Sequence, residues 1–341
     1  MSVLDTPLTR LLGIRTPLVL APMAGASGGQ LAAAVHLAGG FGFTAPTYTG
    51  LADFRAELAL ARAALAQPAG PLPIGAGFLG WKLDAGADAV ALLDAALAAR
   101  VRAVWLAFGA DLARWAAYVR ARAPGTLVFV QVNSVDDALR AVAEYSPDVL
   151  VAQGIESGGH GSATAPPILN LLPLVAAALP AGPPVLGAGG LSSGAHLAAF
   201  LALGAAGAVA GTRFLLTREA TYAPAQKRAV QAAAPGATVR STAFDALRGT
   251  LGWPAGVDGR ALRMPAADAL DAGGALDSAQ RSVAAGMAAG DPAAFVTWAG
   301  TGVGALQEEQ SAQDVVRALH DEAIVALRAA HAVLGAGDAP R

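Results

Sequence analysis

Short apolar runs alternate along this chain with longer Ala- and Leu-rich segments in which charged residues recur at helical spacing. This alternation is typical of βα units that build a parallel sheet. Because the runs are almost continuously apolar, we expect strands that are buried on both faces. We predict strands at Pro17–Pro22, Phe41–Ala45, Leu72–Gly77, Ala103–Ala107, Leu127–Val132, Val149–Ala152, Pro184–Gly187 and Ala208–Gly211.

The segments between these runs predict a matching set of helices. Asp111, Ser134 and Ser192 are candidate N-caps, since each precedes an Ala/Leu-rich segment. Eight strands and eight helices in roughly 230 residues predict an α/β fold of the (β/α)8 TIM-barrel type, which usually needs ~250 residues. A doubly wound sheet is the alternative. The predicted helices lie near Gly29–Ala38, Leu51–Ala66, Gly86–Ala99, Asp111–Ala121, Val135–Glu144, Ile168–Leu179, Ser193–Leu203 and Glu219–Ala232.

The composition changes after Ala232, which divides the chain into three predicted parts. Residues 1–232 would form the barrel, and residues 233–304, rich in Gly, Pro, Asp and Ala, would form a small cap over its mouth. The cap contains one helical patch near Ala275–Ala289 and a motif-like stretch, WPAGVDGR, at Trp253–Arg260. Residues 305–341 would pack outside the barrel as a tail that is helical from Ala305 to Leu334. The alternative is that cap and tail only add packing.

Composition and charge exclude several classes of function. Only 14 % of the 341 residues are charged, against roughly 25 % in average soluble proteins. The uncharged run Ser157–Thr212 is divided by prolines, so we interpret it as buried core and not as a membrane span. The net charge of −2 argues against nucleic-acid or membrane-surface partners.

Met1–Arg15 lacks a signal-peptide pattern, which predicts a cytoplasmic location. The absence of cysteine excludes disulfides, thiolate nucleophiles and iron–sulfur clusters, and we predict no metal site.

Two glycine-rich turns follow the seventh and eighth predicted strands. The first, Gly187–Gly194, fails the dinucleotide fingerprint because Ser192 stands where the third glycine belongs. A glycine-rich turn that enters a helix still offers N–H groups to a phosphate. Barrels often bind phosphate with the loops after these two strands. We therefore predict a phosphate-bearing cofactor here, with the alternative that the glycines only make tight turns.

A third loop, Gln153–Gly161, follows the sixth predicted strand and contains His160 among glycines. A barrel's active site lies at the carboxyl ends of its strands, and an imidazole suits proton abstraction or anion stabilisation near neutral pH. We predict His160 as the catalytic residue. At the ends of the first and fifth strands, Pro22 and Met23 could line the floor with backbone groups and Gln131 with an amide. The other histidines fall inside predicted helices or in the tail, at His36, His196, His320 and His331.

In this order, APMAG, QGIESGGHG, GAGGLSSG and GTRF resemble the FMN-dependent nitronate monooxygenases, formerly called 2-nitropropane dioxygenases. The resemblance runs from about Pro17 to Glu219. It implies a TIM barrel with a small cap, one non-covalent FMN and His160 as the catalytic histidine. It also implies that Pro22 and Met23 contact the flavin ring. Departures at Gly75–Phe78, Gln131 and Met264 indicate a different branch of the superfamily.

Further roles follow from the same resemblance. Gln131 would lie near the flavin pyrimidine, and the residues of the third loop near the ring or the ribityl chain. The two glycine-rich turns would hold the phosphate. The cofactor-binding residues that this resemblance adds to Pro22, Met23 and Gln131 are Gln153, Gly158, Gly159, Gly189, Gly190, Gly211 and Thr212.

The resemblance implies oxidation of an alkyl nitronate, or of a neutral nitroalkane, by FMN and O₂ to a carbonyl compound and nitrite. One alternative is an NAD(P)H-dependent FMN reductase of the quinone or enoyl reductase type. Another is a flavin-binding barrel without turnover. The sequence leaves open the natural nitronate, a homo-oligomeric state and the motion of the cap.

Overall fold

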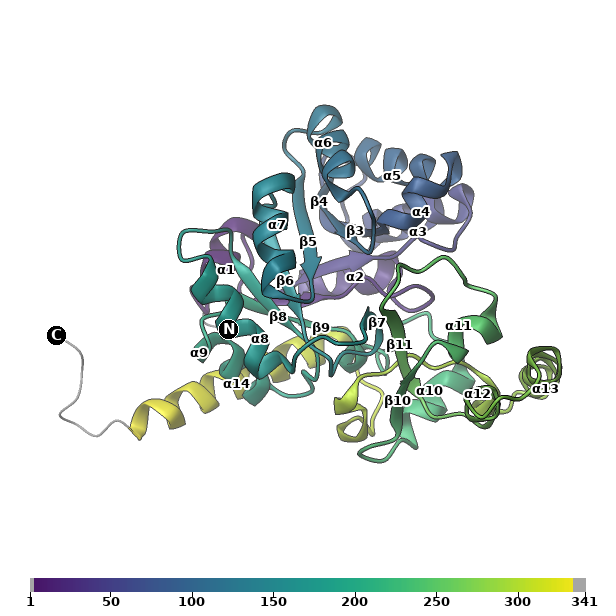
Figure 1. Ribbon diagram of the computed structural model, residues 1–341. Coiled ribbons are helices and arrows are strands. Elements are labelled where there is room, and N and C mark those ends of the chain that lie inside the picture. Colours follow the sequence, from purple (N-terminus) through teal and green to yellow (C-terminus); the bar gives the residue numbers. More distant parts are fainter. Residues whose placement is uncertain (1–2, 334–341) are drawn as a thin grey trace.

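The predicted strands form a closed barrel in the computed structural model, which describes residues 3–333 (Figure 1). Every neighbouring pair is parallel, including the pair of first and last strands that closes the barrel. This closure confirms the TIM barrel and excludes the doubly wound sheet. The barrel strands are β1 (Leu18–Leu20), β2 (Phe41–Thr44), β3 (Leu72–Leu79), β4 (Val101–Ala107), β5 (Leu127–Val132), β6 (Val149–Gln153), β8 (Val185–Ala188) and β9 (Gly207–Ala210).

Helices cover the outside of the barrel, and their bounds lie close to those predicted up to residue 203. Two short helices were not predicted, α1 (Pro7–Leu12) and α4 (Gly80–Ala85). The helices between the strands are α2 (Gly29–Leu37), α3 (Leu51–Ala64), α5 (Ala87–Ala98), α6 (Leu112–Arg122), α7 (Val135–Tyr145), α8 (Ile168–Ala178) and α9 (Gly194–Ala202).

Two of the three predicted N-caps are confirmed. The Asp111 carboxylate accepts from the N–H of Arg114, and the Ser134 hydroxyl accepts from the N–H of Asp137. The prediction for Ser192 is wrong, because the N-cap of α9 is Ser193, whose side chain makes no capping bond. A distant carboxylate replaces it: Glu322 accepts from the N–H of Gly194 at 2.7 Å.

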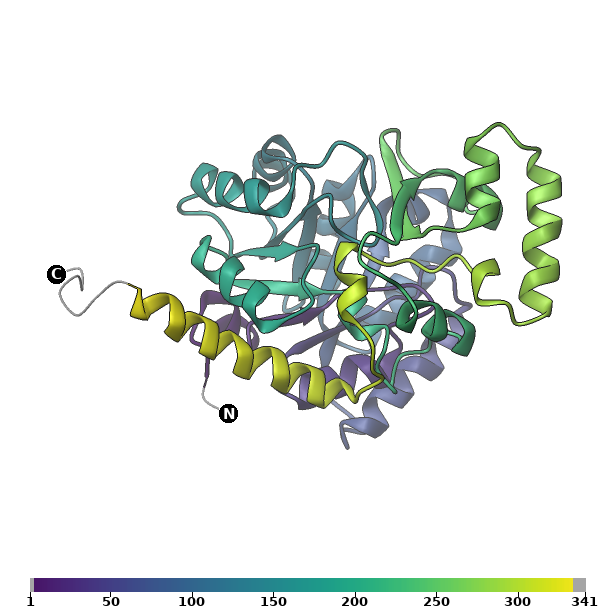
Figure 2. The same ribbon diagram turned by 90° about the horizontal axis from the view of Figure 1, so that it is seen from below.

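The eighth barrel helix is formed by residues near the carboxyl end of the described chain and not by the predicted segment Glu219–Ala232. The helix expected at Glu219–Ala232 is shorter, as α10 (Pro224–Gln231), and contacts the 3₁₀ turns η2 (Pro292–Ala294) and η3 (Thr301–Ala305). The long helix α14 (Ala312–Ala332) instead packs against α9 and α2, and Figure 2 shows it along the barrel's edge. It can do so because its buried side chains recur at helical spacing, at Ala312, Val315, Val316, Leu319 and Ala323.

The cap is built around an antiparallel sheet of β7 (Gly159–Ser162), β11 (Val257–Leu262) and β10 (Thr238–Ser241), with β11 in the middle. Three helices flank it: α11 (Ala243–Arg248), α12 (Pro265–Asp271) and α13 (Leu276–Ala288). The position of α13 confirms the helical patch predicted from the sequence. In Figure 1 this green part lies beside the barrel. The boundaries at residues 232 and 304 stay a prediction, and residues 334–341, with the predicted helix end at Leu334, lie outside the described part.

The strands of the uncharged run lie in the core, as predicted, while its helices also carry exposed residues such as Leu169. Strands β8 and β9, which belong to it, are buried along their whole length. Helices α8 and α9 bury their apolar faces against the barrel. Within residues 3–333, no helix has the length and apolarity that crossing a membrane would take.

An aromatic cluster fills the barrel interior below the mouth. Phe43 makes edge-to-face contacts with Phe41, Trp105 and Phe129, with ring centroids 5.2 to 5.3 Å apart. Phe41 and Phe43 are at most 1 % exposed, and Phe129 is fully buried. Interiors are packed as densely as organic crystals, so this cluster gives the site above it a rigid floor.

We expect Phe129→Ala to lower the free energy of unfolding by about 3–5 kcal/mol, because it removes a buried ring and leaves a cavity. Urea unfolding followed by circular dichroism measures the change. Leu169→Ala is the control: this side chain is 59 % exposed, and surface changes usually stay within about 0.5 kcal/mol. Equal midpoints for Phe129→Ala and the unmodified protein would contradict this account of the core.

Candidate active site

A pocket opens where the carboxyl ends of the barrel strands meet the cap. Every residue predicted for catalysis or cofactor binding lines it, from Pro22 after β1 to Thr212 after β9. The cap contributes Arg248, Trp253 and Trp298 to the same lining. Trp105 of the interior aromatic cluster also lines the pocket. The position of this pocket agrees with the rule that barrel active sites lie at this end.

The turn between β8 and α9 presents free hydrogen-bond donors to the pocket. Gly189 and Gly190 have positive φ values, +117° and +72°, a conformation that other residues rarely adopt. Among the described residues, the N–H groups of Gly190, Leu191 and Ser192 donate no hydrogen bond. The next helical N–H, that of Gly194, is occupied by Glu322. An anion could therefore bind to the turn itself, whereas the N–H of Gly194 is already taken.

The turn after β9 completes this end of the pocket. The 3₁₀ turn η1 (Thr212–Phe214) follows Gly211 directly, and Gly211 lies beside the sulfur of Met23. The Thr212 hydroxyl accepts from the N–H of Gly300 at 2.9 Å, which leaves its own hydrogen available. The buried Ser157 hydroxyl has no partner among the described residues although it lines the pocket. A buried hydroxyl without a partner is costly, so a polar ligand group is the simplest way to satisfy it.

Pro22 and Met23, which follow β1, are among the lining residues of the pocket. The backbone of Met23 is already engaged in a turn. Its N–H donates to Ser27 Oγ at 2.7 Å, and its carbonyl accepts from the N–H groups of Ala26 and Ser27. Pro22 has no N–H. The backbone acceptor left for a ligand at this position is thus the Pro22 carbonyl.

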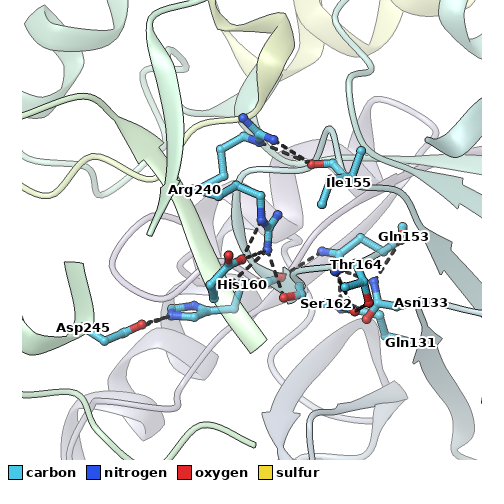
Figure 3. A network of polar contacts seen from close by, with 12 residues as sticks. Gln131, Asn133, Gln153, Ile155, His160, Ser162, Thr164, Arg240 and Asp245 are labelled. Carbon is cyan, nitrogen blue, oxygen red and sulfur yellow. Dashed lines mark hydrogen bonds and ion pairs between the residues drawn. The ribbon is translucent and has the colours of Figure 1, made fainter. Parts of the chain in front are cut away.

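Side-chain amides tie β5, β6 and β7 together, and two of them, Gln131 and Gln153, line the pocket (Figure 3). Gln153 Oε1 accepts from Gln131 Nε2 at 2.8 Å and from Asn133 Nδ2 at 3.0 Å. Gln153 Nε2 in turn donates to the backbone carbonyl of His160 at 3.2 Å. Gln153 therefore fixes the main chain of the histidine, while Gln131 also lines the pocket.

The histidine lies on a strand, not on a loop as the sequence predicted. Gly159–Ser162 form β7, in which His160 pairs with Gly259 of β11. The imidazole Nε2 lies 2.9 and 3.0 Å from the two carboxylate oxygens of Asp245, on α11 (Figure 3). The side chains are 12 % and 7 % exposed, respectively. This contact is short and well shielded from water.

Two tryptophans of the cap enclose the imidazole. Trp253 stacks on His160, with ring centroids 3.5 Å apart and an interplanar angle of 11°. Trp298 lies 4.6 Å away at 53°. Together with Asp245, these rings leave the imidazole little freedom to rotate. A histidine held in one orientation with a carboxylate behind it is suited to act as a general base.

Sequence reasoning missed Asp245, Trp253 and Trp298. Asp245 is 85 residues from His160 along the chain, and nothing in its local sequence marks it. Trp253 is the first residue of WPAGVDGR, so the motif-like composition of that stretch was a signal that could have pointed to it. Asp245 comes near His160 only because a separate segment of the chain folds against β7. Such a contact produces no characteristic spacing of residues in the sequence.

The lining is electropositive. It contains Arg213 and Arg248 and, among the described residues that line it, no Asp or Glu. Burial lowers the pKa of Arg213, whose Nη2 donates to Gln310. Burial also raises the pKa of Tyr222, so this phenol stays protonated near neutral pH and can only donate or accept hydrogen bonds. An anion is the ligand that such a lining favours.

Comparisons with known proteins identify the family and the fold. The nitronate monooxygenase family profile matches residues 81–322. The nitronate monooxygenase npaC of Metarhizium robertsii is 38 % identical over 332 residues, 91 % of each chain. The nitroalkane oxidase of Streptomyces ansochromogenes has a TM-score of 0.78 and 28 % identity, over 95 % of this chain and 100 % of the other. FabK of Thermotoga maritima shares the fold, with a TM-score of 0.79 and 24 % identity over 97 % and 100 %.

The family match covers more than half of the chain, and the npaC relative is similar over nearly its whole length. The residues of the resemblance, His160 among them, line one pocket together with two arginines, and the carboxylate of Asp245 contacts His160 from outside this lining. This protein is an oxidoreductase that belongs to the nitronate monooxygenase family.

Proposed function

We propose that this protein oxidises alkyl nitronates with bound FMN and O₂, giving a carbonyl compound and nitrite. The observation that carries the proposal is the His160–Asp245 pair in a pocket whose charged lining residues are arginines. A nitronate is an anion, and a neutral nitroalkane becomes one by losing its α-proton. The arginines of the pocket would supply positive charge for the anion, and His160 would supply the base for the α-proton.

The residues present fit FMN. The free N–H groups of Gly190, Leu191 and Ser192 would hold the phosphate, with Thr212 opposite. The unpartnered Ser157 hydroxyl is available to the ribityl chain or ring. Pro22, Met23, Gln131, Gln153, Gly158, Gly159, Gly189 and Gly211 would line the remainder. When bound, FMN would supply the electron acceptor for the nitronate and the electron donor for O₂.

His160 would act as base through Nδ1. Carboxylate oxygens only accept hydrogen bonds, so the contact with Asp245 assigns the hydrogen of neutral His160 to Nε2. This leaves the lone pair on Nδ1, which can take the α-proton of a nitroalkane. Asp245 would then stabilise the imidazolium that forms. For a preformed nitronate no proton is removed, and the site would contribute only its positive charge.

The decisive experiment is an absorption spectrum of the purified protein, followed by separate additions of a nitronate in air and of NADH without oxygen. We expect a flavin spectrum, release of FMN and not FAD on heating, and nitrite from the nitronate. NADH should leave the flavin oxidised. Bleaching by NADH without nitrite formation would favour the FMN reductase. A flavin that responds to neither would favour a binding module, and a colourless protein that takes up no added FMN would overturn every flavin assignment.

Gly190→Val should lose FMN while the barrel still folds. A side chain at this position would strain the positive φ of the turn that bears the free N–H groups, and its Cβ would contact Glu156 at 3.4 Å. Gly236→Val is a matched control, since Gly236 also has a positive φ but an added Cβ there would meet no atom within 4 Å. Flavin stoichiometry by absorbance and folding by circular dichroism measure the outcome. Full FMN content in a folded Gly190→Val protein would refute the phosphate assignment.

His160→Asn should retain FMN and fold but lose roughly 10²–10⁴-fold in kcat/KM on a neutral nitroalkane, the usual contribution of a general base. The loss on the preformed nitronate should be smaller, because that step needs no proton removal. Asp245→Asn should follow the same pattern, since an amide does not fix the Nε2–H tautomer.

The control for this series is His196→Asn, an exposed residue of α9 bonded to Ser193. We expect its turnover to stay within a few-fold of the unmodified enzyme. Kinetics on both substrate forms, with the protonated and ionised solutions prepared separately, distinguish the variants. Normal turnover of the neutral substrate by His160→Asn would show that this histidine is not the base.

A further inference from the structure

Two arginines of the cap bind the main chain at the two ends of the segment that leads to His160. Arg260 donates to the Ile155 carbonyl from Nη2 at 3.1 Å and from Nε at 3.3 Å. Arg240 donates from Nη2 to the Gly161 carbonyl at 2.9 Å. Figure 3 labels Ile155 and Arg240, one partner of each of these contacts. The segment Ile155–Gly161 is thus held at its first and last residues by side chains from β11 and β10.

The strand register explains how both arginines reach this segment. Arg240 pairs with Arg260 across β10 and β11, and Arg260 pairs with Gly159 of β7. Successive side chains alternate between the faces of a sheet, so Arg240 and Arg260 share one face while His160 points to the other. A Cβ on Gly161 would lie 2.8 Å from Gln153 Oε1. Gly161 therefore allows the Gln153 amide to approach the strand closely.

On this face, Arg240 is paired with a carboxylate of the cap, whereas Arg260 bonds to neutral groups. Arg240 Nε donates to Asp258 Oδ1 at 2.6 Å, and the two side chains are 10 % and 18 % exposed. Arg260 donates a further bond to Thr238 at 3.3 Å. Hydrogen bonds from a charged donor are stronger than neutral ones, especially away from water. The pair of arginines is therefore a firm attachment between cap and segment.

The same geometry accounts for the motif-like stretch WPAGVDGR. Its Trp253 stacks on the imidazole. Its Gly259 leaves room for Trp298, since a Cβ there would lie 2.3 Å from that ring. Its Asp258 orients Arg240, and its Arg260 binds Ile155. Each of these residues acts on His160 or on its segment.

We propose that Arg240 and Arg260 are positioning residues, which fix Ile155–Gly161 so that His160 keeps its contact with Asp245 and its place in the pocket. Neither arginine lines the pocket, so neither would touch substrate or cofactor. The kinetic part of this inference rests on the proposed function. Misplacement of a catalytic group by 1 Å can cost about 10²-fold in rate.

Arg260→Met, in the FMN-loaded enzyme, tests the proposal without leaving a buried carboxylate unpaired, because the partners of Arg260 are a carbonyl and a hydroxyl. We expect kcat on neutral nitroethane to fall at least about ten-fold with little change in KM, toward the loss expected from misplacement. The loss on ethyl nitronate should be smaller. Arg260→Lys, which keeps a charged donor, should recover part of kcat. Arg263→Met is the matched control, because Arg263 follows β11 but is 62 % exposed and binds only Asp268 through its side chain.

Hydrogen–deuterium exchange supplies a readout that does not depend on activity. We expect faster exchange in Arg260→Met confined to peptides covering residues 153–162, with the FMN content retained. Unchanged exchange there would overturn the proposal, whatever the activity. So would a lysine variant no better than methionine, or accelerated exchange throughout cap and barrel, which indicates a purely structural role. If the unmodified enzyme does not oxidise nitronates, the proposed function fails while the exchange result still decides the positioning role.

Discussion

The pairing of β7 with β11 is the constraint on which the site depends. β7 leaves the barrel directly after β6, yet it hydrogen-bonds to a strand of the cap. His160 therefore belongs at once to the barrel mouth and to the cap sheet. Its imidazole meets Asp245, Trp253 and Trp298 because the cap packs around this strand. Without the pairing, the barrel alone would present a histidine with no carboxylate beside it.

Charge is distributed so that an anion meets positive groups at both ends of the pocket. Arg213 lies on η1 at the barrel end, and Arg248 ends α11 on the cap side. Asp245 faces the histidine from behind and is not part of the lining. The negative charge that stabilises an imidazolium is thus separated from the surface an anionic substrate would contact. In the proposed function, this separation would let one site favour both proton removal and anion binding.

Two glycines of the resembling motifs, Gly190 after β8 and Gly158 after β6, are required for different physical reasons, although the motifs look alike in sequence. Gly190 has a positive φ and opens a turn whose N–H groups are free. Gly158 is required by packing instead, since a Cβ there would lie 2.4 Å from the backbone nitrogen of Gly300. The resemblance alone assigns both to the cofactor. The structure adds that Gly158 also lets residues 299–300 of the cap pack against the histidine segment.

The sequence by itself determined the barrel and the barrel-side half of the site. Strand and helix periodicity is local, and parallel strands bring their carboxyl ends together without further information, so turns after β6, β8 and β9 had to converge. Tertiary structure decided the rest. The eighth barrel helix is α14 and not α10, because the buried apolar side chains of α14 pack against α9 and α2. The partners of His160 and its segment, Asp245, Arg240 and Arg260, come from a segment with weak periodicity and lie 79 to 105 residues away from what they bind. Contacts at such separations are set by the packing of the cap, which no local pattern encodes.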